Sequence, residues 1–296
     1  MHYKMSTAEK IFVFLNYTFL TLLCLIMLYP FINSLAISLS DRLEVQRGKV
    51  SLWPLGFNFD SYAYILRSSR FMGGLGVTVF ITIVGTAWTV FMTSMFAYPL
   101  SRRDFRLKTP ITMMVVFTMF FGGGLIPYFL LIRFIGLFDT IWVYIIPSAI
   151  SPWSLIILRN FFQQIPAELE ESAHIDGAND FIIMIRIIMP ISLPSIATIA
   201  LWAMVGYWNT FTSSLYFTSN PNLRTMQIVL RSVLLNEDGA SAGGLGSSGD
   251  FDRFREMTPQ SLQRAWIMAT TLPIICVYPF LQKYFVKGVI VGSLKG

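Results

Sequence analysis

The chain has 296 residues, of which 54% are hydrophobic and only 13% are charged. Soluble domains carry about 25% charged residues, so this composition excludes an ordinary water-soluble enzyme or binding domain. The net charge of +6 comes without a basic cluster interleaved with aromatic residues, so nucleic acid is not an expected partner. The two cysteines, Cys24 and Cys276, fall in apolar segments and indicate neither a disulfide framework nor a metal site.

Long stretches without charged residues dominate the chain, and a helix needs about 20 apolar residues to cross a bilayer. We predict an all-α polytopic membrane protein of one domain with six transmembrane helices, at about residues 11–37, 71–99, 110–132, 140–158, 187–208 and 265–282. The first segment is too long for a signal-peptide core and lacks a following small-residue cleavage site, so it should be retained. Gly122-Gly-Gly124 interrupts the third segment, and Pro147 and Pro152 are expected to kink the fourth.

A short acidic stretch, residues 168–180, lies between the fourth and fifth segments. Pro166 suits the first turn of a helix, and the carboxylates after it lie at the positive end of the helix dipole. Gly177 tolerates positive φ and is a natural end for that helix. These signals predict a helix over about residues 166–176, outside the lipid.

Basic residues in short loops favour the cytoplasmic side of a membrane. The loop between the second and third segments, residues 102–108, holds four basic residues in seven. Two spans separate this loop from the acidic helix, so both must lie on one side. We therefore expect both termini in the cytoplasm, including a tail over residues 283–296, and extracytoplasmic loops over residues 41–70 and 209–264.

The acidic stretch resembles a known family signature. Glu171-Ser-Ala-His-Ile-Asp-Gly177, nine further residues and then Ile187-Ile-Met-Pro190 are similar to the E-A-A-x₃-G-x₉-I-x-L-P pattern of bacterial ABC importer permeases, with Ser172 in place of the first Ala and Met189 in place of Leu. In that family the segment is a coupling helix that docks into a cleft on the ATPase subunit. The resemblance implies that the coupling residues are Glu171, Ser172, Ala173, Asp176, Gly177 and Pro190. Of these, Glu171 would be the charge partner, Ala173 the close-packing site and Gly177 the turn. The alternative is an ordinary surface helix.

The C-terminal stretch, residues 278–296, resembles the carbohydrate-importer branch of the family, which includes the smaller permease of the maltose importer. There the tail enters the ATPase dimer interface, which implies such a role for Lys287, Gly292 and Lys295; a frayed terminus is the alternative. Tyr207, Trp208 and Asn209 have the aromatic and amide chemistry that binds sugars, so they are candidates for the substrate path. An interfacial aromatic belt explains them equally well.

The chain lacks the G-x₄-G-K-[ST] phosphate loop, H-E-x-x-H and G-x-S-x-G motifs, and its predicted spans have no ionisable residue near their centres. We therefore expect no enzyme activity and no cofactor in this chain, and an energy source outside it. The resemblance implies that ATP and Mg are bound by partner ATPase subunits.

The expected function is that of a permease subunit in a binding-protein-dependent ABC importer, with an oligosaccharide as the favoured cargo. The resemblance implies a bacterial cell membrane and four kinds of partner: a second related permease, a cytosolic ATPase dimer, an extracytoplasmic solute-binding protein and membrane lipid. The alternatives are a permease of the same superfamily for a non-sugar solute, a self-contained secondary transporter and a membrane-embedded enzyme.

Overall fold

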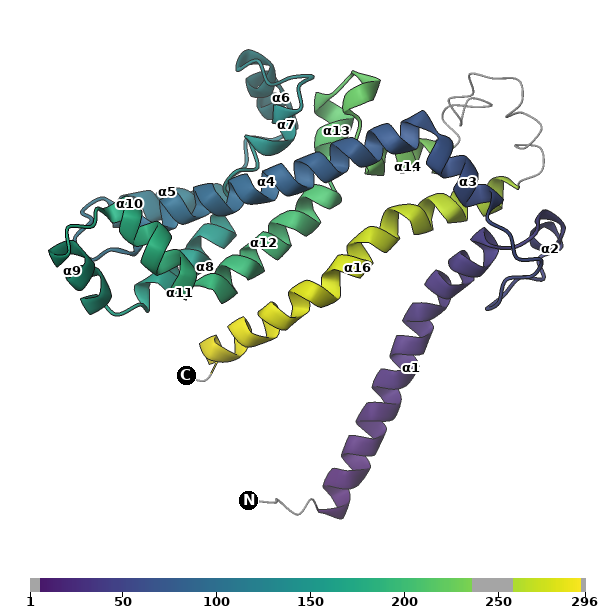
Figure 1. Ribbon diagram of the computed structural model, residues 1–296, viewed down its shortest axis with the longest axis horizontal. Helices are drawn as coiled ribbons and strands as arrows, with labels where there is room; N and C mark the ends of the chain where they lie inside the picture. The colour runs from purple at the N-terminus through teal and green to yellow at the C-terminus, as the bar shows by residue number, and fades with distance from the viewer. Residues whose placement is uncertain (1–5, 236–257, 294–296) are drawn as a thin grey trace. The chain divides into compact units, whose positions relative to one another are not determined.

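The computed structural model describes the backbone of residues 6–235 and 258–293, with side chains as far as Val277, and every regular element in this part of the chain is a helix (Figure 1). The chain divides into two compact units, Met1–Ser69 with Ser232–Leu272, and Arg70–Arg231 with Pro273–Gly296. The prediction of an all-α fold is confirmed for the described residues.

The first unit contains the helix α1 (Thr7–Ser38), the short helices α2 (Arg42–Gln46) and α3 (Asp60–Arg67), and the beginning of α16 (Pro259–Ser293). Ser6 and Glu9 form a capping box at the start of α1, which satisfies two amide groups that no helical carbonyl reaches. Along most of α1 the apolar side chains are exposed. Burial begins only near its end, where the Ser38 hydroxyl bonds to the Tyr62 hydroxyl at 2.8 Å.

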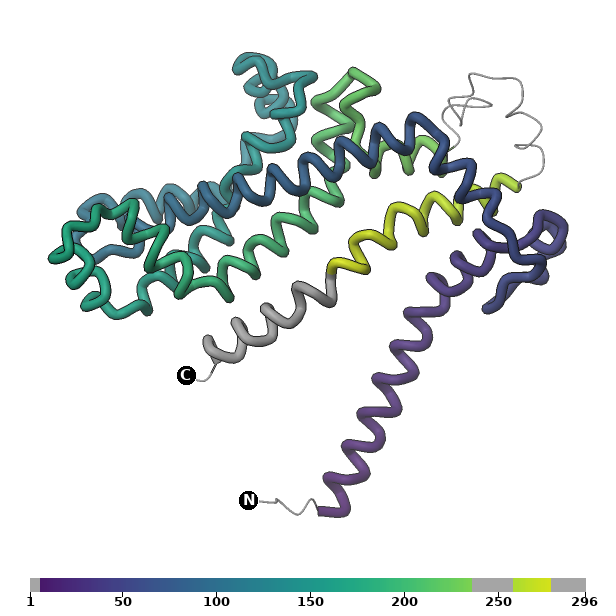
Figure 2. The backbone as a smooth tube through the Cα atoms, in the orientation of Figure 1, coloured from purple at the N-terminus to yellow at the C-terminus, as the bar shows by residue number. Residues whose placement is uncertain are grey.

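The second unit is built around α4 (Ser69–Ser101), as the tube in Figure 2 shows. The chain continues through α5 (Lys108–Phe120), α6 (Leu125–Phe134), α7 (Trp142–Ile145), α8 (Pro152–Gln163), α9 (Glu168–Ile175), α10 (Asp180–Ile183), a π-helical turn η1 (Met184–Ile188), α11 (Met189–Ile191), α12 (Leu193–Trp208), α13 (Thr212–Phe217), a 3₁₀ turn η2 (Pro221–Leu223) and α14 (Met226–Leu234).

Three of the predicted spans are not continuous helices. The segment 110–132 is split, because α5 ends at Phe120 and Gly124 takes a φ of 80° before α6 begins. The segment 140–158 is interrupted rather than kinked, because Ser151 is held extended before Pro152 and α8 starts only there. The segment 187–208 is broken at Ser192, and the helices on either side of the break differ in direction by 87°.

Among the described residues, two helices, α1 and α4, are long and apolar enough to cross a membrane by themselves, or up to three if the bent pair Asp180–Ile191 and Leu193–Trp208 is one span. The number of six spans therefore stays a prediction, and the third, fourth and fifth predicted segments each contain more than one helix.

A cluster of buried apolar residues joins α4 to α8, α9, the α10–η1 segment and α12. Its members include Ala97, Leu155, Phe162, Ala173, Ile183, Ile188 and Ile199. At the other end of α4, the Thr78 hydroxyl accepts a hydrogen bond from the Met226 amide at 2.8 Å. Because α4 has 33 residues, and a helix rises about 1.5 Å per residue, α9 and the start of α14 lie at opposite ends of a rod about 50 Å long.

Candidate functional site

The acidic stretch folds as the short helix α9 and ends in a tight turn. Gly177 has a φ of +83°, a conformation that side chains with a Cβ rarely adopt. The Gly177 amide donates to the His174 carbonyl, and the Ala178 amide donates to the Ala173 carbonyl, both at 3.0 Å. These are the two bonds of a Schellman motif. The glycine therefore ends α9 at the point that its position in the sequence indicates.

The next helix begins at once. The Asn179 side chain accepts a hydrogen bond from the Ile182 amide at 2.9 Å and caps the start of α10. Only Asp176–Asn179 separates the two helices, so α9 and the α10–η1–α11 segment are joined by a short connection.

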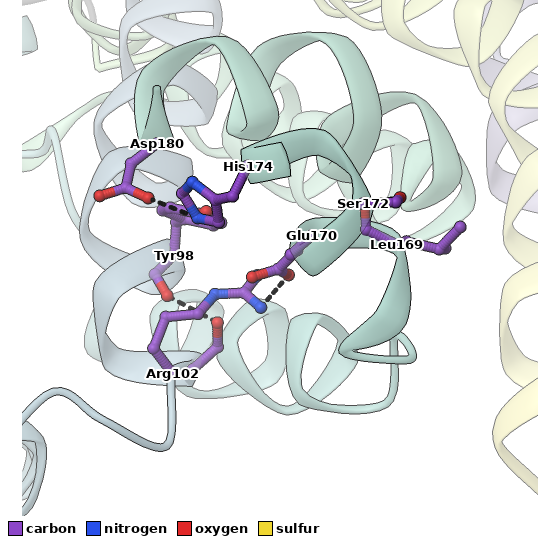
Figure 3. A network of polar contacts seen from close by, with 8 residues as sticks. Tyr98, Arg102, Leu169, Glu170, Ser172, His174 and Asp180 are labelled. Atoms are coloured by element: carbon purple, nitrogen blue, oxygen red, sulfur yellow. Dashed lines mark hydrogen bonds and ion pairs between the residues drawn. The ribbon is translucent and has the colours of Figure 1, made fainter. Parts of the chain in front are cut away.

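A buried ion pair holds α9 to the end of α4. The Arg102 guanidinium, one residue beyond α4, is paired with the Glu170 carboxylate, and Figure 3 shows the two side chains directed at each other. Glu170 is 7% exposed, whereas the neighbouring Glu171 faces solvent. The guanidinium carbon of Arg102 also lies 4.3 Å from the centre of the Tyr98 ring, within range of a cation–π interaction.

Burial lowers the pKa of Arg102 from its ordinary value. The group nevertheless stays charged near neutral pH, because a guanidinium does not lose its proton in proteins under these conditions. The pair with Glu170 therefore places a charged guanidinium where it is largely shielded from water, so removing either partner would leave the other buried without compensation.

A cleft of about 1370 Å³ opens beside this pair, between the end of α4, the connection after it, and the segment from α8 to α10. Charges of both signs line it: Arg103, Asp104 and Arg106 come from the connection after α4, and Glu168, Glu171 and Asp180 come from α9 and α10. His174 lies 3.3 Å from Asp180, as Figure 3 also shows, so the two form an ion pair when the imidazole is protonated.

The residues expected to couple to an ATPase fall into three places. Glu171, Ser172, Asp176 and Gly177 are all exposed on α9 or its terminal turn. Ala173 is buried in the apolar cluster of this chain, so its close packing is with helices of the same subunit rather than with a partner. Pro190 is exposed on α11, separated from α9 by α10 and η1.

No motif in the sequence points to the residues that attach α9. Glu170 and Arg102 are not distinguished from their neighbours, although the basic loop that contains Arg102 and the acidic helix are expected on the same side of the membrane. That shared placement was the available signal. It does not select Glu170 over its acidic neighbours, because the choice depends on which face of α9 turns toward α4.

The residues proposed for a substrate path are also separated. Tyr207 is buried, and its hydroxyl bonds to the Thr89 hydroxyl at 2.9 Å. Trp208 is buried as well, whereas Asn209 is exposed and its amide donates to the Val205 carbonyl at 2.9 Å. Of the three, Tyr207 lines a cavity, one of about 470 Å³ between α4, α8 and α12.

The three residues expected at an ATPase interface lie in the C-terminal tail, for which the structure describes no side chains. Lys287 and Gly292 belong to the part of α16 for which only the backbone is described, and Lys295 lies outside the described residues. In the part of the chain searched for metal ligands, no group of three or more His, Cys, Asp or Glu side chains is placed to hold an ion.

Comparison with known proteins gives concordant matches. The family model of binding-protein-dependent transport system inner membrane components matches residues 91–291. The polygalacturonan/rhamnogalacturonan transport system permease protein YtcP of Bacillus subtilis is 42% identical over 97% of this chain and 99% of its own. The arabinooligosaccharides transport system permease protein AraQ of the same organism is 28% identical over 94% of each chain.

The fold has a solved counterpart. A chain in the crystal structure of a bacterial ABC transporter involved in the import of the acidic polysaccharide alginate superposes with a TM-score of 0.87 and 29% identity, covering 96% of this chain and 99% of that one. With the family model matching well over half of the sequence, this chain belongs to the family of binding-protein-dependent transport system inner membrane components.

Proposed function

We propose that this protein is a permease subunit of an ABC importer that carries an oligosaccharide across the bacterial cell membrane. Relatives at 42% and 28% identity are named as permeases for polygalacturonan/rhamnogalacturonan and for arabinooligosaccharides, and the solved counterpart belongs to an importer of alginate. The functional unit would contain a second related permease, a cytosolic ATPase dimer and an extracytoplasmic solute-binding protein. Bound ATP and Mg belong to the ATPase subunits.

The observation that carries the proposal is the attachment of α9. An exposed acidic surface that includes Glu171 is offered to a partner, while Glu170 on the same helix is locked to the end of α4. A helix of eight residues has little stability of its own, so it transmits force only when it is held by the rest of the protein. The buried pair with Arg102 supplies that hold.

In this mechanism, closure of the ATPase dimer displaces α9. The displacement passes to α4 through Glu170 and Arg102, to the apolar cluster through Ala173, and to α11 and α12 through the turn at Gly177. Rigid-body rocking of packed helices then opens the path alternately to the two sides of the membrane. The acidic helix and the start of α14 lie at opposite ends of α4, which supports a topology with α9 in the cytoplasm and α14 outside.

The test is uptake into proteoliposomes that contain the complete importer. Uptake of an oligosaccharide that requires ATP hydrolysis is the expected result. The substrate set should include galacturonate oligomers, arabinose oligomers and a non-sugar control, such as an amino acid mixture. Uptake driven by an ion gradient without nucleotide would favour a secondary transporter, and ATP-driven uptake of the non-sugar set alone would overturn the assignment to carbohydrate.

A further inference from the structure

The cavity of about 470 Å³ beside Tyr207 lies within the second unit and has no part in the attachment of α9. Its walls come from α4, the connection before α8, the first turn of α8, and the second half of α12. The volume is in the range of about 300–1,000 Å³ that small-molecule sites occupy.

Aromatic and hydroxyl groups make up most of the lining. Trp153 and Trp202 offer ring faces that are still accessible, at 58% and 39% exposure. Thr89, Ser151 and Ser154 offer hydroxyl groups. Within the described residues, neither the two indole N–H groups nor the Ser151 and Ser154 hydroxyls make a hydrogen bond, so these donors remain available to a ligand.

The inner wall is preformed. A Cβ on Gly85 would come within 2.6 Å of the Tyr207 ring, so the absence of a side chain there lets the ring pack closely against α4. The bond between the Tyr207 and Thr89 hydroxyls then fixes the ring. A rigid wall reduces the entropy lost when a ligand is ordered in the cavity.

Among the residues whose side chains the structure describes, none that lines the cavity is charged. A carboxylate placed there would lose its hydration without gaining a cation, which is strongly unfavourable. Sugar rings, by contrast, present apolar C–H faces to aromatic rings and hydroxyl groups to polar side chains, and the lining offers both kinds of partner.

We propose that this cavity is a subsite for one neutral sugar unit of the transported chain, with Trp202 as its stacking wall and Ser151 and Ser154 as hydroxyl partners. The assignment rests on the proposed oligosaccharide transport and makes it more specific. It predicts that an uncharged unit enters this cavity in preference to a uronate, even where the whole substrate is acidic.

The first experiment measures ATP-dependent uptake by the complete importer with neutral and uronate-containing oligosaccharides. Trp202→Ala should raise KM for a neutral oligosaccharide at least fivefold. The matched control is Trp142→Ala, because Trp142 is similarly exposed but does not line the cavity, and its KM should stay within twofold of the wild-type value. Ser151→Arg adds a cation at an exposed position that caps nothing, so it should shift the ratio of uronate to neutral uptake at least fivefold toward uronate.

The second experiment does not depend on transport. With Cys24 and Cys276 replaced by Ser, Ser151→Cys would be labelled by a neutral thiol reagent in the presence and absence of a neutral oligosaccharide. The sugar should slow labelling at least threefold, whereas a galacturonate oligomer at the same concentration should not. Equal labelling rates, together with an unchanged KM in Trp202→Ala, would overturn the subsite. Absence of ATP-dependent sugar uptake in the wild-type importer would instead overturn the proposed function.

Discussion

Replacing Glu170 with Gln removes the charge that attaches α9 to α4 and changes little else in size or shape. Removing one partner of a fully buried ion pair costs about 3–5 kcal/mol, whereas an exposed pair is worth about 0–1 kcal/mol. The side chains of Arg102 and Glu170 are 18% and 10% exposed, so the cost of breaking this pair should lie nearer that of a buried pair than that of an exposed one. Gln still offers the guanidinium a neutral acceptor, so we expect α9 to open more easily by about 2 kcal/mol.

Hydrogen exchange of the α9 amides in lipid nanodiscs measures this opening directly. A change of about 2 kcal/mol corresponds to about a 30-fold loss of protection, since each 1.36 kcal/mol is a factor of ten. The importer that carries Glu170→Gln should hydrolyse ATP but accumulate less sugar, because α9 moves without α4.

Glu171→Gln is the matched control. It removes the same charge from the same turn, and so has the same effect on the helix dipole, but Glu171 is exposed and has no ion pair within the described residues. Exchange in α9 should therefore stay near the wild-type rate in this variant. If both variants lost protection equally, the attachment through Glu170 would be wrong and the dipole would account for the effect.

A double-mutant cycle tests the pairing itself. Arg102→Gln alone, Glu170→Gln alone and the double variant should give an interaction energy of about 2 kcal/mol in α9 exchange, because the two residues are in direct contact. Additive effects would show that the two side chains act independently.

Three further substitutions have expected outcomes. Gly177→Val forces a β-branched residue to a φ of +83°, which costs at least about 1–2 kcal/mol, so ATP hydrolysis should continue while uptake falls several-fold; wild-type uptake would refute the turn's role. Gly85→Ala would bring a methyl group within 2.6 Å of the Tyr207 ring, so it should destabilise the fold by about 1–3 kcal/mol and lower Tm. Gly76→Ala, where a Cβ would meet no described atom within 4 Å, should leave Tm unchanged. Tyr144→Phe removes a buried hydroxyl that donates to the Leu223 carbonyl at 2.7 Å and should cost about 1–3 kcal/mol in thermal unfolding; an unchanged Tm would show that the bond is dispensable.

Local signals in the sequence predict several elements well. The acidic helix was expected over residues 166–176 and is observed at Glu168–Ile175, because carboxylates in the first turn and a glycine after the last are features of the chain itself. The long helices α1 and α4 extend slightly beyond the predicted 11–37 and 71–99, since uninterrupted apolar runs have no internal stop. Gly122-Gly-Gly124 and Pro152 also mark where the helices of the third and fourth segments are interrupted.

Composition and local motifs are enough to show that the chain is apolar and helical and that an acidic helix ends at Gly177. They do not show that Glu170 rather than Glu171 turns inward, or that the Tyr207 ring packs against Gly85, 122 positions earlier in the chain; these contacts become visible only when the helices are packed. Such contacts depend on the rotation of one packed helix against another. The hydrophobic pattern of the nearly uniformly apolar α4 carries little information about that rotation. The pattern of α9 is misleading, because Leu169 and Ile175 are exposed while Glu170 is buried.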